Sequence, residues 1–435
     1  MLRTTAAVIA GKGARLATRF RGGGGSAFPG LVAERVDPRF LAHALAGVGS
    51  VIVVTGTNGK TTTTRMLVAL LRAHGLRVLT NPTGSNFTRG VISSILRGLP
   101  LSGRAEADVA VLELDEAHAL KFVEVVTPTH ALLLNVARDQ LDRFAEIDHT
   151  ARLLERLAAR ATTGVVLNID DPYVARSRNV VQPSAAVQYF GLDESIAHRL
   201  PEILEADVRD DDDDAPEPGP GAGSLRPRDE REFDIAFADG ADVGPVALRQ
   251  RGLAAMINAT AATTMAREVL GDAFRPDTAA AALAAVNPPF GRGEVIDIDG
   301  QPLELVLVKN PAGFTVALST YGSSPVATMI AINDAAADGR DVSWLYDVSF
   351  ESLRERGVFM TSGVRAYDMA LRLAYDEVGV DQIEVALIPA LDRFLGAHPD
   401  EPKRLFCTYT AMMALRRTLA GRYGLPEFGE EAAHV

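Results

Sequence analysis

The sequence predicts an α/β protein with two parts, a phosphate-binding domain on a parallel sheet and a second α/β domain behind it. Residues 51–54 form an apolar run that leads through a glycine turn into an apolar-periodic helical pattern. From about residue 49 to 171, short apolar runs alternate with longer amphipathic segments, as in βαβ units. A second alternation of this kind begins near Leu303.

The composition limits the class of protein. A chain of 435 residues predicts two or three domains, and 47% hydrophobic with 23% charged residues is a normal globular balance. The net charge of −12 argues against a nucleic-acid partner. The only cysteine, Cys407, cannot form an intrachain disulfide and indicates a reducing compartment. No apolar run approaches the length of a membrane span.

Residues 1–48 form a basic N-terminal segment and turn. The first 33 residues contain arginines but no acid. Three structures fit this pattern: a transit peptide, a basic amphipathic segment that touches anionic lipid or a partner, and an ordinary helix that ends in the glycines of residues 22–25. We favour the ordinary helix.

The turn after the first strand has the residues of a phosphate cradle. Its glycines let backbone N–H groups approach phosphate oxygens at the N-terminus of the next helix. Lys60 is expected to reach the terminal phosphates and Thr61 to hold Mg²⁺. The strict motif requires glycine where Val54 stands, so only a shorter form is present. A simple helix-capping turn is the alternative, which the preceding apolar strand disfavours. The predicted nucleotide contacts are Gly56, Thr57, Asn58, Gly59, Lys60, Thr61 and Thr62.

The remaining pattern divides the chain into a central domain, residues 49–292, and a C-terminal domain, residues 293–435. Residues 205–232 contain an aspartate run and a Pro/Gly-rich run, so we expect a disordered acidic insert rather than a metal site. An alanine-rich helix at 252–270 and a break at 287–293 precede the second domain. The expected strands are 51–54, 109–114, 131–134, 164–167, 303–308, 326–332 and 383–388.

Several motifs together resemble a known family. The cradle, residues 112–116 (LELDE), 135–143 (NVARDQLDR) and 168–171 (NIDD) resemble the ATP-binding central domain of Mur ligases, and GRGE at 291–294 fits the same plan. Motifs of the C-terminal half narrow the resemblance to MurT, the ligase-like subunit of the lipid II isoglutaminyl synthase, and the resemblance covers nearly the whole chain, from residue 22 to about 419. Its motifs are KNPAG at 309–313, IND at 332–334, ADGRDVSWLYD at 337–347, RAYDMA at 365–370 and YTA at 409–411.

The resemblance implies an ATP-dependent carbon–nitrogen ligase with a Mur ligase-like fold. Its substrate would be the α-carboxylate of D-glutamate in the lipid II stem peptide, amidated through an acyl phosphate to D-isoglutamine. ATP and Mg²⁺ are the implied cofactors. Glu113 is the expected second metal contact and Glu116 a further candidate. For both, the alternative is an acid favoured by a helix N-terminus.

The same resemblance places Asn258 on the adenine-binding helix and Arg292 at a phosphate. Asn168 and Asp170 fit the site or a strand-end turn equally well. A polar loop is expected near phosphate or substrate, although such loops are often only turns. Its candidate residues are Thr83, Ser85, Asn86 and Arg89.

Three features depart from related enzymes. Amino-acid-adding Mur ligases usually place a metal-binding histidine where this chain has Gln140, and a carbamoylated lysine near the position of Glu155. Their second metal site is therefore in doubt here. Many MurT proteins also contain a four-cysteine zinc ribbon, and with one cysteine we expect no zinc.

This chain is not expected to release ammonia from glutamine by itself. Cys407 lacks a glycine-rich nucleophile turn and a positioned histidine, so we expect a buried core cysteine. The resemblance implies a separate class I glutamine amidotransferase subunit, GatD, bound to the C-terminal domain. An aspartate of that domain would complete the partner's Cys-His pair, with Asp347 preferred over Asp341. Asp341 could instead cap a helix or turn, with Trp344 packed nearby.

Two other functions remain open at this point. One is a ligase that adds an amino acid, as other Mur ligases and folylpolyglutamate synthases do. The other is a nucleotide-regulated scaffold without turnover. The peptidoglycan interpretation predicts a bacterial cytoplasmic protein at the inner face of the plasma membrane, in contact with it but not spanning it.

Overall fold

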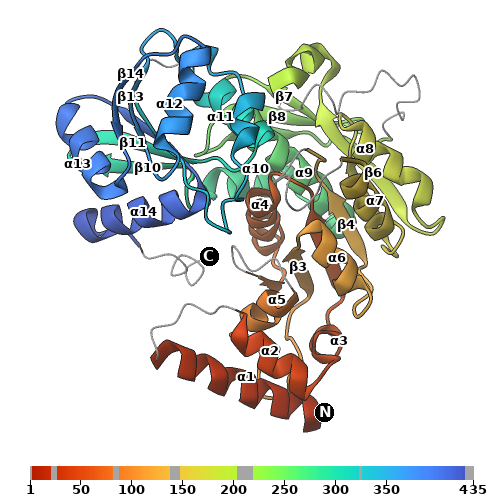
Figure 1. Ribbon diagram of the computed structural model, residues 1–435. Helices are drawn as coiled ribbons and strands as arrows, with labels where there is room; N and C mark the ends of the chain where they lie inside the picture. The colour runs from red at the N-terminus through yellow and green to blue at the C-terminus, as the bar shows by residue number, and fades with distance from the viewer. Residues whose placement is uncertain are drawn as a thin grey trace.

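The computed structural model describes residues 2–20, 27–81, 88–137, 147–202, 219–322 and 326–426. They form two α/β units, each built on one sheet with an apolar core on either face (Figure 1). A layer of helices at the N-terminus extends from the first unit.

The first sheet has nine strands in the order β2-β3-β1-β4-β5-β6-β7-β8-β9. Neighbours are parallel from β2 to β7, and the last two pairs are antiparallel. Because β1 lies between β3 and β4 and all three are parallel, the segments that follow these strands meet at the carboxyl ends of the strands. The strands are β1 (Ser50–Thr55), β2 (Val78–Thr80), β3 (Val109–Glu113), β4 (His130–Leu133), β5 (Gly164–Asn168), β6 (Ala186–Leu192), β7 (Gly223–Pro227), β8 (Glu232–Phe237) and β9 (Val243–Ala247).

Alternate residues of these strands supply the cores of opposite faces. Val53 belongs to one cluster and Ile52 and Val54 to the other. The Ile52 face is covered by α4 (Lys60–Ala73), α9 (Leu253–Leu270) and α10 (Pro276–Ala285). The other face packs against α5 (Thr88–Ile95), α6 (Glu116–Val123) and α7 (Ile147–Ala158), and shorter elements are α8 (Pro172–Ala175), η1 (Arg176–Val180), η2 (Glu194–Glu202) and η4 (Gly271–Ala273).

The N-terminal segment folds into α1 (Leu2–Phe20), α2 (Phe28–Val36) and α3 (Phe40–Leu45). Figure 1 shows α1 at the outer end of the molecule, with α2 lying between it and α5. A Cβ at Gly30 of α2 would lie only 1.9 Å from the carbonyl oxygen of Arg89 on α5, so this glycine lets the two helices approach closely. A helix was expected at this end of the chain, and α1 confirms it.

The second sheet has six strands in the order β10-β11-β15-β12-β13-β14, parallel except for the β10–β11 hairpin. Its outer strand β14 is an edge. The elements are β10 (Arg292–Ile298), β11 (Gln301–Leu307), α11 (Pro311–Tyr321), β12 (Ala327–Ala331), η5 (Ser343–Asp347), η6 (Glu351–Leu353), β13 (Val358–Ser362), α12 (Ala366–Tyr375), β14 (Val380–Glu384), α13 (Leu387–Ala397), β15 (Lys403–Cys407) and α14 (Tyr409–Tyr423).

The structure corrects two expectations. The expectation of a disordered insert at 205–232 was wrong from residue 219 onward. There β7 pairs with β6 and β8, and Leu225 is completely buried. Gly223 permits this packing, since a Cβ would lie 2.4 Å from the Thr264 hydroxyl oxygen of α9. Residues 203–218 lie outside the described residues. The strand expected at 383–388 ends at Glu384, and α13 begins at Leu387, because the apolar run joins two elements.

None of the helices in the described part of the chain has the length and apolar character needed to cross a bilayer.

Candidate active site

The turn between β1 and α4 has the shape that its glycines permit. Gly56 and Gly59 have φ angles of 134° and 85°, which other residues rarely adopt. A Cβ at Gly56 would lie 2.9 Å from the backbone nitrogen of Asn135, and one at Gly59 would lie 2.3 Å from Oδ1 of Asn258. The predicted adenine-helix residue Asn258 therefore lies against the turn, where its Oδ1 also accepts a hydrogen bond from Thr63 (3.2 Å).

Asn135, which follows β4, holds the turn in place. Its Oδ1 accepts a hydrogen bond from the Asn58 N–H (2.8 Å), and its Nδ2 donates to the Asn58 carbonyl (3.1 Å). The Thr57 N–H donates to the Asn135 carbonyl at 3.0 Å. Sequence reasoning gave Asn135 no role of its own, because a hydrogen bond between residues 77 positions apart leaves no signal in local spacing.

Lys60 lies inside the turn and is only 8% exposed. Its Nζ donates to the carbonyl oxygens of Gly56 and of Thr57, the latter at 3.2 Å, and lies 3.6 Å from Oε2 of Glu116. The next residues of the cradle, Thr61 and Thr62, are also buried. The ammonium group is thus held inside the turn by two of its carbonyl oxygens and by the nearby carboxylate of Glu116.

Thr61 and Glu113, the two predicted metal contacts, meet in the structure. The Thr61 hydroxyl donates to Oε1 of Glu113 at 2.9 Å, and both side chains are buried. Asn81 fixes the backbone of Glu113, because its Oδ1 accepts from the Glu113 N–H (2.9 Å) and its Nδ2 donates to the Glu113 carbonyl (2.8 Å). A hydroxyl and a carboxylate beside a phosphate cradle are oxygen ligands that suit Mg²⁺. Glu116, the other metal candidate, instead faces Lys60.

Arg292, expected as the last residue of the central domain, is the first residue of β10 in the second sheet and lies close enough to Glu113 to feel its charge. Burial lowers the pKa of its guanidinium, the charge of Glu113 opposes this shift, and the charge of Arg65 adds to it. Arg65 on α4 donates hydrogen bonds to the Asn287 and Pro288 carbonyls, both at 3.2 Å, and so fixes the linker. The predicted phosphate arginine therefore lies beside the predicted metal carboxylate.

The C-terminal domain contributes two further groups that sequence reasoning left without a role. Nζ of Lys309 donates to the Thr57 carbonyl at 3.3 Å, the same oxygen that Lys60 contacts. Nδ2 of Asn310 donates to Oδ1 of Asn58 at 3.3 Å, while its own Oδ1 caps α11. Two lysines from two domains thus converge on one carbonyl of the cradle.

A cavity of about 280 Å³ opens beside Thr61 and Glu113. It lies between α4 and α5 along β2, the free edge strand of the sheet. The buried hydroxyl of Thr64, which lines it, has no hydrogen-bond partner. Arg72 and Arg97 line the cavity as well. The walls therefore join the candidate metal site to positively charged side chains.

Other predicted residues have structural partners. Nε of Arg89 pairs with Glu34 of α2 at 2.7 Å. Asn168 donates to the Leu134 carbonyl at 2.9 Å and accepts from the Asp170 N–H at 3.0 Å, which is the strand-end turn. Outside the described residues lie Thr83, Ser85, Asn86 and Gln140.

The two candidate aspartates of the C-terminal domain differ. Oδ1 of Asp341 accepts a hydrogen bond from the Ser343 N–H at 2.8 Å, and this bond lowers the pKa of Asp341. Asp341 therefore fixes the turn that leads into η5, while Trp344 is buried against Phe314. Asp347 ends η5 with an exposed side chain. Both side chains are exposed, and the hydrogen bond from Ser343 is what distinguishes Asp341 from Asp347.

Cys407 is fully buried at the end of β15, and burial raises the pKa of its thiol far above the usual range. A thiol in this state is a poor nucleophile. In the described residues, no group of three or more His, Cys, Asp and Glu side chains could hold a metal ion.

Two family models match the chain, the Mur ligase middle domain over residues 54–212 and the MurT ligase C-terminal domain over 307–412. A protein of Streptococcus pneumoniae (strain ATCC BAA-255 / R6) is named lipid II isoglutaminyl synthase (glutamine-hydrolyzing) subunit MurT. It is 31% identical to this chain over 97% of the chain and 98% of its own length. The chain belongs to the MurT family. The resemblance drawn from its C-terminal motifs is therefore confirmed.

Solved structures confirm the Mur ligase-like fold of this MurT chain. MurF from Acinetobacter baumannii superposes with a TM-score of 0.66 over 91% of this chain and 80% of its own, at 19% identity. Folylpolyglutamate synthase of Mycobacterium tuberculosis, complexed with ADP, superposes with a TM-score of 0.65 over 90% and 95%, at 17% identity.

Proposed function

We propose that this chain is the ligase subunit of a lipid II isoglutaminyl synthase. It would use ATP to convert the α-carboxylate of D-glutamate in the lipid II stem peptide into the amide of D-isoglutamine. The observation that carries the proposal is the buried Thr61–Glu113 pair beside the phosphate cradle. The full-length similarity to a subunit with that name supports the choice of substrate.

ATP makes the carboxylate reactive. A carboxylate oxygen leaves poorly. Attack of that oxygen on the γ-phosphorus of ATP would release ADP and give an acyl phosphate, and ammonia would then attack the acyl carbon and displace phosphate. The protein's part is alignment and charge neutralisation. The cradle N–H groups would hold the phosphates, and Lys60, Lys309 and Arg292 would offset their charge. Mg²⁺, held by Thr61 and Glu113, would supply further positive charge to the phosphates.

The cavity along β2 is where we place the acceptor. It begins at Thr61 and Glu113, so a carboxylate entering it would reach the nucleotide's terminal phosphate. Arg72 and Arg97 give the same cavity a positive wall in a chain of net charge −12. An acidic peptide is the complementary ligand.

Ammonia would come from a GatD-like class I glutamine amidotransferase. The similar S. pneumoniae protein is named as one subunit of a glutamine-hydrolyzing enzyme, and the buried Cys407 is unsuited to glutamine hydrolysis. Asp347 would complete the partner's Cys-His pair by orienting the imidazole.

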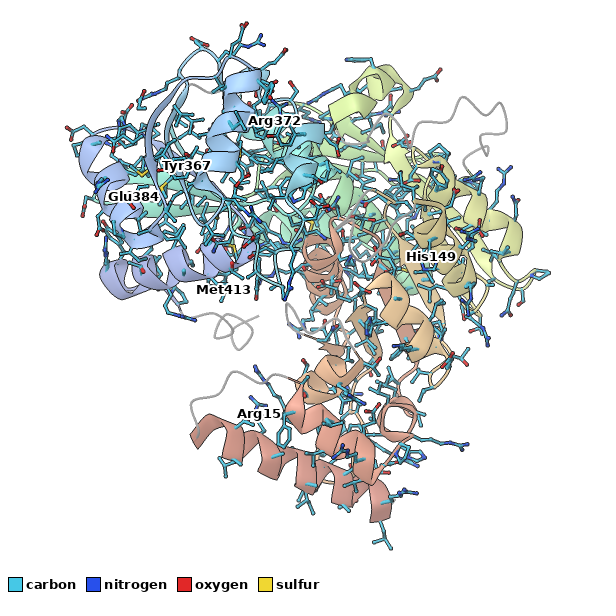
Figure 2. The ribbon with its side chains drawn as sticks, viewed as in Figure 1. Arg15, His149, Tyr367, Arg372, Glu384 and Met413 are labelled. Carbon is cyan, nitrogen blue, oxygen red and sulfur yellow. The ribbon has the colours of Figure 1, made fainter. Side chains whose placement is uncertain are left out.

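An exposed apolar surface beside Asp347 fits such a partner. Along α12, Tyr367, Leu371 and Tyr375 recur every fourth residue and are 67%, 54% and 69% exposed. Tyr375 contacts Tyr346, the neighbour of Asp347, with ring centroids 6.0 Å apart. Figure 2 shows Tyr367 on this helix, with Glu384 at the end of the edge strand β14. Large exposed aromatic patches mark protein interfaces.

The cellular site follows from the proposed substrate. Lipid II is anchored in the membrane, so the complex would act in the bacterial cytoplasm at the inner face of the plasma membrane. The acidic net charge does not favour nucleic acid.

Co-expression with a candidate amidotransferase tests the function. The purified pair should convert lipid II to a slightly lighter product when ATP and glutamine are both present, and release phosphate in equal amount. A product heavier by one amino-acid residue would establish the amino-acid-adding alternative. Binding of ATP without product or phosphate would establish the scaffold alternative.

A further inference from the structure

The outward face of α1 is apolar and uncovered. Leu2, Ile9 and Leu16 recur every seventh residue, which keeps them on nearly one side of a helix, and they are 92%, 57% and 58% exposed. On the opposite side, Ala7 and Val8 are fully buried in the core that α1 shares with the following helices. The helix is therefore apolar on the side that packs and again on the side that faces solvent, which an ordinary surface helix avoids.

The charge of α1 contrasts with the rest of the chain. The chain has a net charge of −12, yet its first acid is Glu34. Arg3, Lys12 and Arg15 accompany the apolar face. Nε of Arg3 donates to the Val36 carbonyl and Nζ of Lys12 to the Leu99 carbonyl, both at 2.7 Å, so these cations lie along the sides of the helix. Figure 2 labels Arg15 near the other end of α1.

We propose that α1 lies in the plane of an anionic phospholipid bilayer. Leu2, Ile9 and Leu16 would enter the boundary of the acyl chains, while Arg3, Lys12 and Arg15 meet lipid phosphates. A lipid surface fits better than a protein surface, because the exposed stripe offers apolar side chains without groups that would fix a specific partner. The position of α1 at the outer end of the molecule leaves it free to lie flat on a membrane (Figure 1).

This inference rests on the proposed function for its purpose. A membrane-anchored acceptor must reach the cavity along β2, and α2 connects α1 to α5, which lines that cavity. Docking through α1 would hold the cavity near the lipid surface and raise the local concentration of the acceptor.

Vesicle sedimentation of the co-purified complex tests the binding itself. The complex should pellet with vesicles containing phosphatidylglycerol, bind phosphatidylcholine vesicles weakly, and lose binding as salt rises. Ile9→Glu should lower the partition coefficient at least roughly tenfold, because it replaces an apolar side chain that would enter the bilayer with a charged one. Ile9→Trp should raise it, since Trp favours the interface. Val180→Glu changes another exposed aliphatic residue, on η1, and should bind like wild type.

Equal pelleting of wild type and Ile9→Glu would overturn the proposal. So would a change in oligomeric mass on Ile9→Glu without a change in lipid binding, because a second copy would then cover the stripe.

An activity measurement separates this inference from the proposed function. Ile9→Glu should lose most of its rate with lipid II in vesicles and keep the wild-type rate with a water-soluble short-chain lipid II. Equal loss on both substrates would contradict membrane docking. Absence of amidation by wild type on both would instead contradict the proposed function.

Discussion

The phosphate cradle and the α12 surface are built in opposite ways. In the cradle, Lys60, Thr61 and Glu113 are buried, and each polar group has a partner inside the chain. On α12, Tyr367 and Tyr375 are more than two-thirds exposed. Under the proposed function, the chain itself would complete the nucleotide chemistry, whereas the nitrogen supply would depend on another molecule. Changes in the first region should stop the reaction with any nitrogen source, and changes in the second should stop it with glutamine only.

The largest effect is expected for Lys60→Met. It removes the cation that the cradle holds for the terminal phosphate, so amidation should fall about 10³-fold with glutamine and with ammonia alike. Phosphate release measures the rate. Lys121→Met on the neighbouring helix α6 is the matched control and should stay within twofold of wild type. If Lys60→Met lost only the glutamine-driven reaction, the division between the two regions would be wrong.

Asp347→Asn should have the second largest effect and the opposite selectivity. We expect the glutamine-driven rate to fall at least about 100-fold, because the partner's imidazole loses a charged orienting group. The rate with added ammonia should remain. Asp341→Asn is the control, since asparagine can still accept the Ser343 hydrogen bond that caps η5. Comparable losses in both variants would remove Asp347 from the proposed role.

The apolar surface should affect assembly more weakly. Leu371→Glu places a charge in the middle of the exposed α12 stripe, so affinity for the amidotransferase should fall roughly 10- to 100-fold. Isothermal titration calorimetry measures the affinity. Val295→Glu changes a residue of similar exposure (53%) on β10 and should bind normally. Normal binding by both variants would place the partner elsewhere.

The smallest effect concerns stability. Burial lowers the pKa of His130 on β4 to about 4, while an unfolded histidine titrates near pH 6.5. Below that pH the unfolded state binds more protons, so stability is lost as pH falls from about 6.5 to 4. At pH 5 the loss should be roughly 2 kcal/mol.

His130→Gln should remove that part of the pH dependence in urea unfolding between pH 7 and 5. His149→Gln changes an exposed histidine on α7 (Figure 2) and should leave the pH dependence of stability unchanged. If the unfolding free energy of His130→Gln fell with pH as steeply as that of wild type, another group would cause the loss of stability in acid.

The sequence predicted those parts of the site that depend on neighbouring residues. A strand, a glycine turn and a helix must place Lys60 and Thr61 beside each other. Glu113 could be added because it ends a strand of the same sheet, and β3 does pair with β1. The strands β1, β3, β4 and β5 were found because burial on both faces makes their apolar runs continuous, whereas β2 and β6 were not predicted.

Groups that meet through tertiary packing could not be found in this way. Lys309 reaches the carbonyl of Thr57, 252 positions away, only because the second domain folds back on the first. Asn135 and Asn81 act through backbone hydrogen bonds that leave no periodic pattern. The β7 strand was missed because its Gly/Pro-rich surroundings indicate a loop, although Leu225 and its partners on β8 bury an apolar face.

The most direct test of the central claim follows the oxygen atoms. Lipid II labelled with ¹⁸O in the α-carboxylate of its D-glutamate would be amidated by the complex with ATP and glutamine, and the released phosphate analysed by mass. We predict one ¹⁸O atom in the phosphate for each amide formed, since activation transfers the phosphoryl group to the carboxylate oxygen. Amide formation with phosphate that contains only ¹⁶O would contradict the account.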